Sequence, residues 1–249
     1  MLVTGGAKRI GGAISRAFAK AGWHVVIHYN SSADAAEDLA AELASAETVR
    51  ADLCDDDAGT EMVAQLAPRL ADWRALINCA SVFEADDVTA LDPAINRRAM
   101  QINARAPALL AQAYLRHARS KAGRHVVQVT DQKLANPNPD FFSYTMSKHA
   151  LDATIAMLAM GAAREDDRIY GLAPGAILAS HDQSPEEAER SHRMNLLGRK
   201  TGPDEIADAA LFLAHGHLAS GQTLYVDSGQ HLLSQPRDVI YLARERDEA

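Results

Sequence analysis

The sequence predicts a single-domain α/β fold with a doubly wound parallel sheet, and three observations support this prediction. A glycine-rich turn follows the first apolar run and precedes a helical pattern. Short β-rich runs then alternate with helical segments along the rest of the chain. The length of 249 residues suits one α/β domain, and no repeat or low-complexity tract divides it. Such alternation places parallel strands between two helical layers, with ligands at the carboxyl ends of the strands.

The composition is that of an ordinary soluble globular protein, with 47% hydrophobic and 23% charged residues. A net charge of −8 argues against a general nucleic-acid or membrane-surface binder. No run approaches the ~18 apolar residues of a membrane span, and the chain begins directly with the fold motif, so we expect a cytoplasmic protein. Cys54 and Cys79 are expected to be reduced thiols. The motif His215-Gly216-His217 lacks clustered carboxylates, so no metal site is expected.

The first elements are typical of a mononucleotide-binding unit. Residues 1–4 are expected to form a strand, which is short enough to suggest that the N-terminus is truncated, and residues 13–21 a helix. The glycines of residues 5–12, between them, would let the backbone approach a diphosphate at the helix N-terminus. Residues 23–29 are predicted to form the second strand, and residues 33–44 an amphipathic helix.

The alternation continues through the rest of the chain. The loop 136–139 cannot be helical because it contains two prolines. The further expected strands are residues 47–50, 75–78, 124–129, 168–172 and 222–226, and the further expected helices are residues 56–70, 93–117, 142–163 and 201–214.

Two segments near the C-terminus are not part of the expected core. The polar run 179–189, within a segment of about 176–200, is expected to be a mobile lid over the site, with an inert surface loop as the alternative. Residues 237–249 include a short apolar run, so this tail is expected either to reach a neighbouring subunit or to fray.

Tyr144 and Lys148 are four residues apart in a predicted helix, so they share one face. A free phenol ionises near pH ~10, and a neighbouring ammonium group would lower its pKa and suit it to proton transfer. On an ordinary helix such a pair is often simply solvated. The glycine-rich turn at the start of the chain favours the active-site interpretation.

An ordered set of motifs resembles the short-chain dehydrogenase/reductase family over essentially the whole chain. The resemblance implies a Rossmann-type fold and an NAD(P)(H)-dependent oxidoreductase, expected to be a homotetramer. It also implies that Tyr144 donates a proton, that Lys148 lowers the Tyr144 pKa and holds the nicotinamide ribose, and that Asn103 holds a water of the proton relay. The motifs are Thr4-Gly5-x-x-x-Arg9-Ile10-Gly11, Asp52-Leu53, Asn78-Cys79-Ala80-Ser81, Asn103, Tyr144-x-x-x-Lys148, Pro174-Gly175 and Asp227-Ser228-Gly229.

The end of the second strand favours NADP over NAD. It lacks the acidic residue that binds the adenine ribose hydroxyls of NAD, and Lys8 and Arg9 are expected nearby in the glycine turn. The expected cofactor contacts are Gly5, Lys8, Arg9, Ile10, Gly11, Tyr29, Asn30, Ser31, Ser32, Asp52, Leu53, Asn78, Ala80, Ser81, Tyr144, Lys148, Pro174, Gly175 and Ile177.

One departure from the family pattern points to a branch of it. Asp131 stands where the family usually has its catalytic serine, thirteen residues before the tyrosine. A carboxylate suits a nitrogen heterocycle, because it can accept from N–H or amino groups and relay protons. With the turn Thr-Gly-x-x-x-Arg-Ile-Gly and the pair His28-Tyr29, this aspartate resembles the pteridine reductase branch. The alternative is that Asp131 caps a local turn.

The expected substrate contacts are Arg9, Val82, Phe83 and Asp131. Arg9 would reach the cofactor phosphates or an anionic substrate edge; alternatively it is a solvated residue at the helix start. Pteridine reductases have an aromatic residue where this chain has Val82, which weakens the substrate assignment. Phe83 would replace it if the loop shifts by one residue, or would pack in the core.

These residues favour an NADPH-dependent reductase that transfers a hydride to a pterin-like heterocycle of the dihydropteridine or dihydrofolate type. One alternative is an NADP(H)-dependent reductase or dehydrogenase of another carbonyl or imine. A third hypothesis is a non-catalytic dinucleotide-binding sensor. The presence of Asn103, Tyr144 and Lys148 together argues against the sensor, because dinucleotide binding alone does not need all three.

Overall fold

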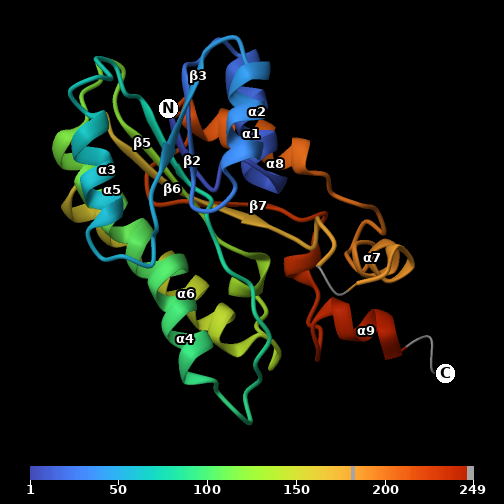
Figure 1. Ribbon diagram of the computed structural model, residues 1–249. Helices are drawn as coiled ribbons and strands as arrows, with labels where there is room; N and C mark the ends of the chain where they lie inside the picture. Colours follow the sequence, from blue (N-terminus) through green and yellow to red (C-terminus); the bar gives the residue numbers. More distant parts are fainter. Residues whose placement is uncertain (181–182, 246–249) are drawn as a thin grey trace.

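The structure, a computed structural model, describes residues 1–180 and 183–245, without the side chain of residue 245. Within these residues, seven parallel strands form one sheet in the order β3-β2-β1-β4-β5-β6-β7 (Figure 1). The order reverses direction beside β1, which defines a doubly wound sheet. The strands are β1 (Leu2–Thr4), β2 (Val25–Tyr29), β3 (Ala46–Arg50), β4 (Ala75–Asn78), β5 (His125–Val129), β6 (Arg168–Pro174) and β7 (Thr223–Val226).

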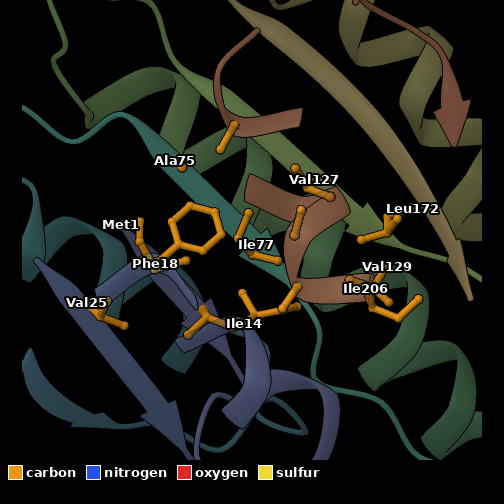
Figure 2. Packing of buried hydrophobic residues seen from close by; sticks show 14 of the residues in the cluster. Met1, Ile14, Phe18, Val25, Ala75, Ile77, Val127, Val129, Leu172 and Ile206 are labelled. Carbon is orange, nitrogen blue, oxygen red and sulfur yellow. The ribbon is translucent and has the colours of Figure 1, made fainter. Parts of the chain in front are cut away.

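Helices cover both faces of the sheet (Figure 1). On one face α1 and α8 pack on the central strands, where Ile14, Phe18 and Ile206 meet Ile77 and Val127 (Figure 2). None of the described helices is long and apolar enough to cross a membrane. The helices are α1 (Arg9–Lys20), α2 (Ala33–Glu42), α3 (Ala58–Leu66), α4 (Pro93–Met100), α5 (Ala106–His117), α6 (Phe142–Gly161), α7 (Pro185–Ser191), α8 (Pro203–Ala214) and α9 (Val239–Glu245).

The second apolar cluster lies on the other face, under α3, α5 and α6. Leu110 and Tyr114 of α5 are fully enclosed there, with Leu76 of β4. Because each central strand is covered on both sides, its residues are buried without alternation, as parallel sheets require. The predicted α/β fold with a doubly wound parallel sheet is therefore confirmed.

Several predicted boundaries are wrong for local reasons. Helix α1 begins at Arg9 rather than at residue 13, because Gly11 and Gly12 belong to its first turn. Strand β2 begins two residues later than predicted, because Trp23 closes the end of α1 by donating its N–H to the Phe18 carbonyl. The expected helix 93–117 is interrupted by a π-helical turn (Gln101–Arg105) between α4 and α5.

Candidate active site

A cavity of about 460 Å³ opens at the carboxyl ends of β1, β5 and β6. The glycine turn lines the cavity together with Asp131, Tyr144 and Lys148. Residues 176–178, residue 180 and residues 238–240 line it as well. Ligands of doubly wound sheets bind at this edge, where the strand order reverses.

The glycine turn brings backbone amides close to this cavity. Gly5 adopts a φ of +62°, and a methyl group at Gly11 would lie 2.1 Å from the Gly5 carbonyl oxygen. Thr4 ties the turn to β4, because its hydroxyl accepts the N–H groups of Cys79 and Ala80, each at 3.0 Å. The turn leads into the N-terminus of α1, a place suited to an anionic diphosphate. These residues fit a dinucleotide, which would contact the turn through its phosphates.

His28 supports the glycine turn from β2, and its role was not predicted. The Gly5 N–H donates to His28 Nδ1 at 3.1 Å, and the Nε2–H donates to the Ala51 carbonyl at 3.1 Å. Burial lowers the pKa of His28 to about 4, so the ring is neutral at pH 7. The sequence signal was a polar residue within an otherwise apolar buried strand.

Tyr144 and Asp131 form a hydrogen-bonded pair inside the cavity. The Tyr144 hydroxyl donates to Asp131 Oδ2 at 2.7 Å. Burial raises the pKa of Tyr144 well above its usual value, and the Asp131 carboxylate raises it further. Burial also raises the pKa of Asp131. Tyr144 is thus a neutral phenol that can serve as an acid.

Lys148 lies beside this pair, but the pKa of the Tyr144 phenol is raised overall and not lowered as predicted. Its ammonium group is 5.6 Å from the Tyr144 ring centre and donates to the Val129 carbonyl at 2.8 Å. Burial lowers the pKa of Lys148 itself. Desolvation and the nearer carboxylate outweigh the ammonium group, because the free energy of a buried charge depends first on its lost hydration.

Asp131 caps a local turn, which was the alternative considered for it, and the same carboxylate contacts Tyr144; its part in a proton relay stays a prediction. Its Oδ1 accepts the Lys133 N–H at 2.9 Å and caps the short 3₁₀ helix Gln132–Leu134. Its Oδ2 accepts the hydrogen bond from the Tyr144 hydroxyl. The local cap holds the carboxylate still, so the turn aims Asp131 at the phenol.

Asn103 positions a loop, and its side chain does not line the cavity. Its amide accepts from the Val82 N–H at 2.8 Å and donates to the Val82 carbonyl at 2.9 Å. It also donates to Ser147 Oγ at 3.0 Å and accepts from Ser81 Oγ at 3.1 Å. These bonds occupy the amide, so the prediction that it holds a relay water does not describe this side chain. It fastens the loop after β4 to α6.

The expected cofactor residues divide into three groups. Most line the cavity: Gly5, Lys8, Arg9, Ile10, Gly11, Ala80, Ser81, Tyr144, Lys148, Pro174, Gly175 and Ile177. A second group lies at the ends of β2 and β3, outside the cavity lining: Tyr29, Asn30, Ser31, Ser32 and Asp52, with the Asn30 amide donating to Asp52 at 3.3 Å.

The third group belongs to the core. Asn78 is 3% exposed and donates to the Pro107 carbonyl and to Gln128 Oε1, so it joins β4 to α5 and β5. Leu53 is 5% exposed and packs in the cluster under α3 and α5. Their side chains therefore serve the core, and cofactor contact by these two residues stays a prediction. Their spacing within the motifs was right, but their side chains point into the protein.

The substrate-side residues are also separated by the structure. Phe83 lines the cavity, and its ring centre lies 4.7 Å from the Tyr144 ring centre with the planes at 89°, whereas Val82 does not line the cavity. Phe83 also packs against the buried cluster of Phe141, Tyr144 and Ile240, and its contact with a substrate stays a prediction. Arg9 has a φ of +53° and donates through both terminal nitrogens to the Ala179 carbonyl at 3.2 Å. Arg9 thus spans the mouth of the cavity.

The segment expected as a lid borders the cavity. Ile177 is buried, and Gln183, Ser191 and His192 line the cavity with it. Helix α7 lies within the segment and begins with a capping box between Ser184 and Glu187. The alternative of an inert surface loop is therefore wrong, while lid motion stays a prediction. Residues 181 and 182 of this segment lie outside the described residues.

The C-terminal tail lies on its own chain. Helix α9 packs beside α7 (Figure 1), and Val239 and Ile240 are buried and line the cavity. Fraying is therefore wrong for the tail as far as α9 extends, whereas contact with a neighbouring subunit stays a prediction; residues 246–249 lie outside the described residues. Four residues in and beside the tail line the cavity but were not predicted as site residues: Lys133, Asp238, Val239 and Ile240.

The fold and the site define an α/β oxidoreductase of the dinucleotide-binding class, with an acid-bearing cavity at the edge of the sheet. Residues 5–231 match a family model described as enoyl-(acyl carrier protein) reductase. The chain belongs to the short-chain dehydrogenase/reductase family. This confirms the family indicated by the ordered motifs.

Relatives and solved structures cover nearly the full chain. Dihydromonapterin reductase of Citrobacter koseri is 26% identical over 234 residues, which are 93% of this chain and 96% of that protein. FolM alternative dihydrofolate reductase 1 from Brucella canis, solved with NADP, has a TM-score of 0.87 and 36% identity, covering 95% of each chain. The angucycline C-6 ketoreductase LanV, with bound NADP, has a TM-score of 0.83 and 28% identity, covering 93% of this chain and 95% of its own.

Proposed function

We propose that this protein is an NADPH-dependent reductase that transfers a hydride to a pterin-like heterocycle of the dihydropteridine or dihydrofolate type. The observation that carries the proposal is the 2.7 Å hydrogen bond from Tyr144 to Asp131 within the cavity beside the glycine turn. A pterin ring presents N–H and amino donors together with nitrogens that gain a proton on reduction. A carboxylate and a neutral phenol suit those groups. The similarity to dihydromonapterin reductase and to FolM supports the same substrate class.

The reduced dinucleotide would supply the hydride, and the chain supplies the proton and the orientation. Tyr144 holds its proton because its pKa is raised, and it gives that proton to the ring nitrogen that gains charge. Asp131 accepts a hydrogen bond from a donor group of the ring, and water returns a proton to the phenolate after the transfer. The Lys148 ammonium group stabilises the phenolate formed during the transfer. Phe83 offers an aromatic edge beside the reacting position.

NADP is proposed as the cofactor rather than NAD. Tyr29 to Ser32 place hydroxyl and amide groups at the end of β2, and none of these four residues is the acidic residue that would favour NAD. Lys8 and Arg9 add positive charge to the same mouth. FolM and LanV were both solved with NADP, which supports this choice.

Turnover with purified protein tests the proposal. NADPH oxidation by dihydrobiopterin or dihydrofolate is expected in the wild type and is expected to be abolished by Tyr144→Phe and by Asp131→Ala. The second candidate, a ketone or imine reductase, is favoured by Val82 at the usual aromatic position and by the similarity to LanV. Activity only with ketones or imines, surviving Asp131→Ser, would select that candidate. Cofactor binding without turnover on any substrate would select the sensor.

We also propose a homotetramer in the cytoplasm. The family resemblance supports the assembly, and α6 presents three exposed methionines, Met146, Met157 and Met160, that a neighbouring subunit would cover. Light scattering coupled to size exclusion is expected to give about four times the chain mass of 26.8 kDa. A monomer mass at all concentrations would contradict this assembly.

A further inference from the structure

Three aromatic rings from distant segments form one wall beside Tyr144. Phe83 stacks on Phe141 with ring centres 4.0 Å apart and planes at 23°. Phe141 in turn stacks on Tyr241 of α9, at 5.9 Å and 22°. Ile240 completes the cluster with Tyr144 and Phe141. The wall therefore contacts the proton donor, and one of its three rings, Tyr241, comes from the C-terminal tail.

Phe141 is held in an unusual backbone conformation at the start of α6. Its φ of +53° is left-handed, which costs free energy for a residue with a bulky side chain. The Lys133 ammonium group lies 5.1 Å from its ring centre, and the two stacked rings enclose it. The surroundings therefore hold the ring between the loop after β4 and the tail.

A buried ion pair anchors the tail to this region. Lys133 and Asp238 are 3% and 5% exposed, and their charged atoms are 2.7 Å apart. Asp140 adds a second attachment, since its carboxylate accepts from Arg237 Nε and from the Asp238 N–H, each at 2.8 Å. A buried charge is costly without its partner, so departure of the tail would leave Lys133 unpaired in the interior.

The same lysine connects the tail to the proton-transfer pair. Its backbone N–H donates to Asp131 Oδ1, and its side chain pairs with Asp238. Both Lys133 and Asp238 also line the cavity. A shift of the tail is thus transmitted to the turn that aims Asp131 at Tyr144.

We propose that residues 237–241 form a wall of the substrate site of their own subunit, with Lys133 and Asp238 as the positioning pair and Ile240 as a specificity-determining residue. The inference rests on the proposed function, because it assumes that a flat heterocycle occupies the space beside the aromatic wall. The pair acts on the substrate through Ile240, the aromatic rings and Asp131. The glycine turn is held by Thr4 and His28, so we expect cofactor binding to be independent of the pair.

Asp238→Asn and Lys133→Met test the positioning role. Each variant is compared with the wild type in NADPH affinity, by fluorescence titration, and in dihydropterin KM and kcat. We expect the dihydropterin KM to rise about 10-fold or more, because each change leaves the other member of the ion pair buried without its partner. The NADPH Kd is expected to change less than about 2-fold. The double variant Lys133→Met/Asp238→Leu is expected to recover KM to within about 3-fold of the wild type, because it leaves no unpaired charge. Glu42→Gln removes the exposed Arg16–Glu42 pair and is the control.

Ile240→Ala provides a second test, which leaves no buried charge without its partner. We expect it to change the ratio of kcat/KM for dihydrobiopterin and dihydrofolate about 5-fold or more with NADPH affinity unchanged, because truncating a large aliphatic side chain leaves a cavity. Wild-type KM in both single-charge variants, or equal loss of NADPH and substrate affinity, would overturn the positioning role. An unchanged substrate ratio in Ile240→Ala would overturn its specificity role.

The activity of the wild type with dihydropterins tests the proposed function, separately from the role of the tail. If the wild type reduces no dihydropterin, the proposed function fails, and the variants are compared on the ketone or imine that the wild type does reduce. Calorimetry of dihydropterin binding to the NADP⁺-saturated enzyme gives the same comparison without turnover: weaker binding in Asp238→Asn supports the wall, and equal binding contradicts it.

Discussion

The side of the cavity that we propose for the cofactor and the side that we propose for the substrate are built in different ways. The cofactor side depends on backbone contacts, with a methyl group excluded at Gly11 and two amides held by Thr4. The substrate side depends on side chains from three distant segments, held by the Lys133–Asp238 ion pair and by stacked rings. Where the backbone approaches this closely, a side chain larger than that of glycine does not fit, so the turn tolerates few substitutions. A side-chain wall can be altered residue by residue, so substrate choice can change while dinucleotide binding is kept.

Tyr144 lies where the two sides meet, and its loss is expected to have the largest effect. Tyr144→Phe removes the proton donor but keeps the ring, so kcat should fall ~10²–10⁴-fold, the usual contribution of a general acid. NADPH affinity should stay near that of the wild type. Steady-state kinetics and a fluorescence titration check both. Tyr225→Phe, on β7 and stacked on His231, is the control and should keep full activity.

Gly11 and Gly12 are neighbours in the first turn of α1, but only Gly11 is expected to be required for close backbone contact. Replacing each by alanine therefore distinguishes a steric effect from an effect on helix propensity. In Gly11→Ala the new methyl group would lie 2.1 Å from the Gly5 carbonyl oxygen, so we expect NADPH affinity to fall more than ~10-fold, with lower stability. In Gly12→Ala the nearest atom is 3.4 Å away, so stability should be equal or rise by up to ~1 kcal/mol. Thermal unfolding with and without NADPH measures both. Equal behaviour of the two variants would refute a turn held by backbone approach.

His28 makes the cofactor side sensitive to acid. Its folded pKa of about 4 is below the usual value of 6.5, so the folded state favours the neutral ring. Below pH 6.5 the unfolded chain takes up a proton that the folded chain does not, and stability falls until the pH reaches about 4. Between pH 7 and 5 this histidine should account for roughly 2 kcal/mol of lost stability.

Urea unfolding at the two pH values checks this contribution. His28→Asn has no titrating group at the position, so its stability should fall less steeply with acidification than that of the wild type. Because the other histidines are present in both proteins, the difference between the two slopes belongs to His28. Parallel slopes would rule out a neutral, buried imidazole at this position.

The smallest effect is expected for the loop after β4. Phe83→Ala removes one ring of the wall, so substrate KM should rise about 10-fold with kcat reduced less, as for loss of an aromatic contact. Val82→Ala should behave as the wild type, because Val82 is held by its backbone bonds to Asn103. Dihydropterin kinetics of the two variants decide between them. A larger defect in Val82→Ala than in Phe83→Ala would indicate that Val82, and not Phe83, contacts the substrate.

The cofactor side was the more predictable of the two from sequence. Gly5, Gly11, Tyr144 and Lys148 were placed correctly because they act through short-range motifs, a tight turn and one helical turn. Asn78 and Leu53 belong to equally recognisable motifs, yet their side chains are used by the core. A motif locates the backbone, whereas the direction of each side chain depends on the packing around it.

Most of the residues on the side proposed for the substrate could not be predicted from the sequence. Lys133 and Asp238 are 105 positions apart (238 − 133), and no local pattern joins them before the chain folds. The tail shows a short apolar run, from which burial but not its partner could be inferred. The sign of the Tyr144 pKa shift was also missed, because it depends on desolvation and on the distance to Asp131.

The amino-acid sequence by itself determined the α/β class, the glycine turn, the family and the pair of Tyr144 with Asp131, because periodicity and short spacings act between residues that are near in the chain. Only the tertiary structure decided that Phe83 and not Val82 is the aromatic neighbour of the phenol, that Asn103 holds a loop, and that the C-terminal tail lies on its own active site. Those outcomes depend on burial, charge pairing and ring stacking between distant segments, which arise only when the chain is packed.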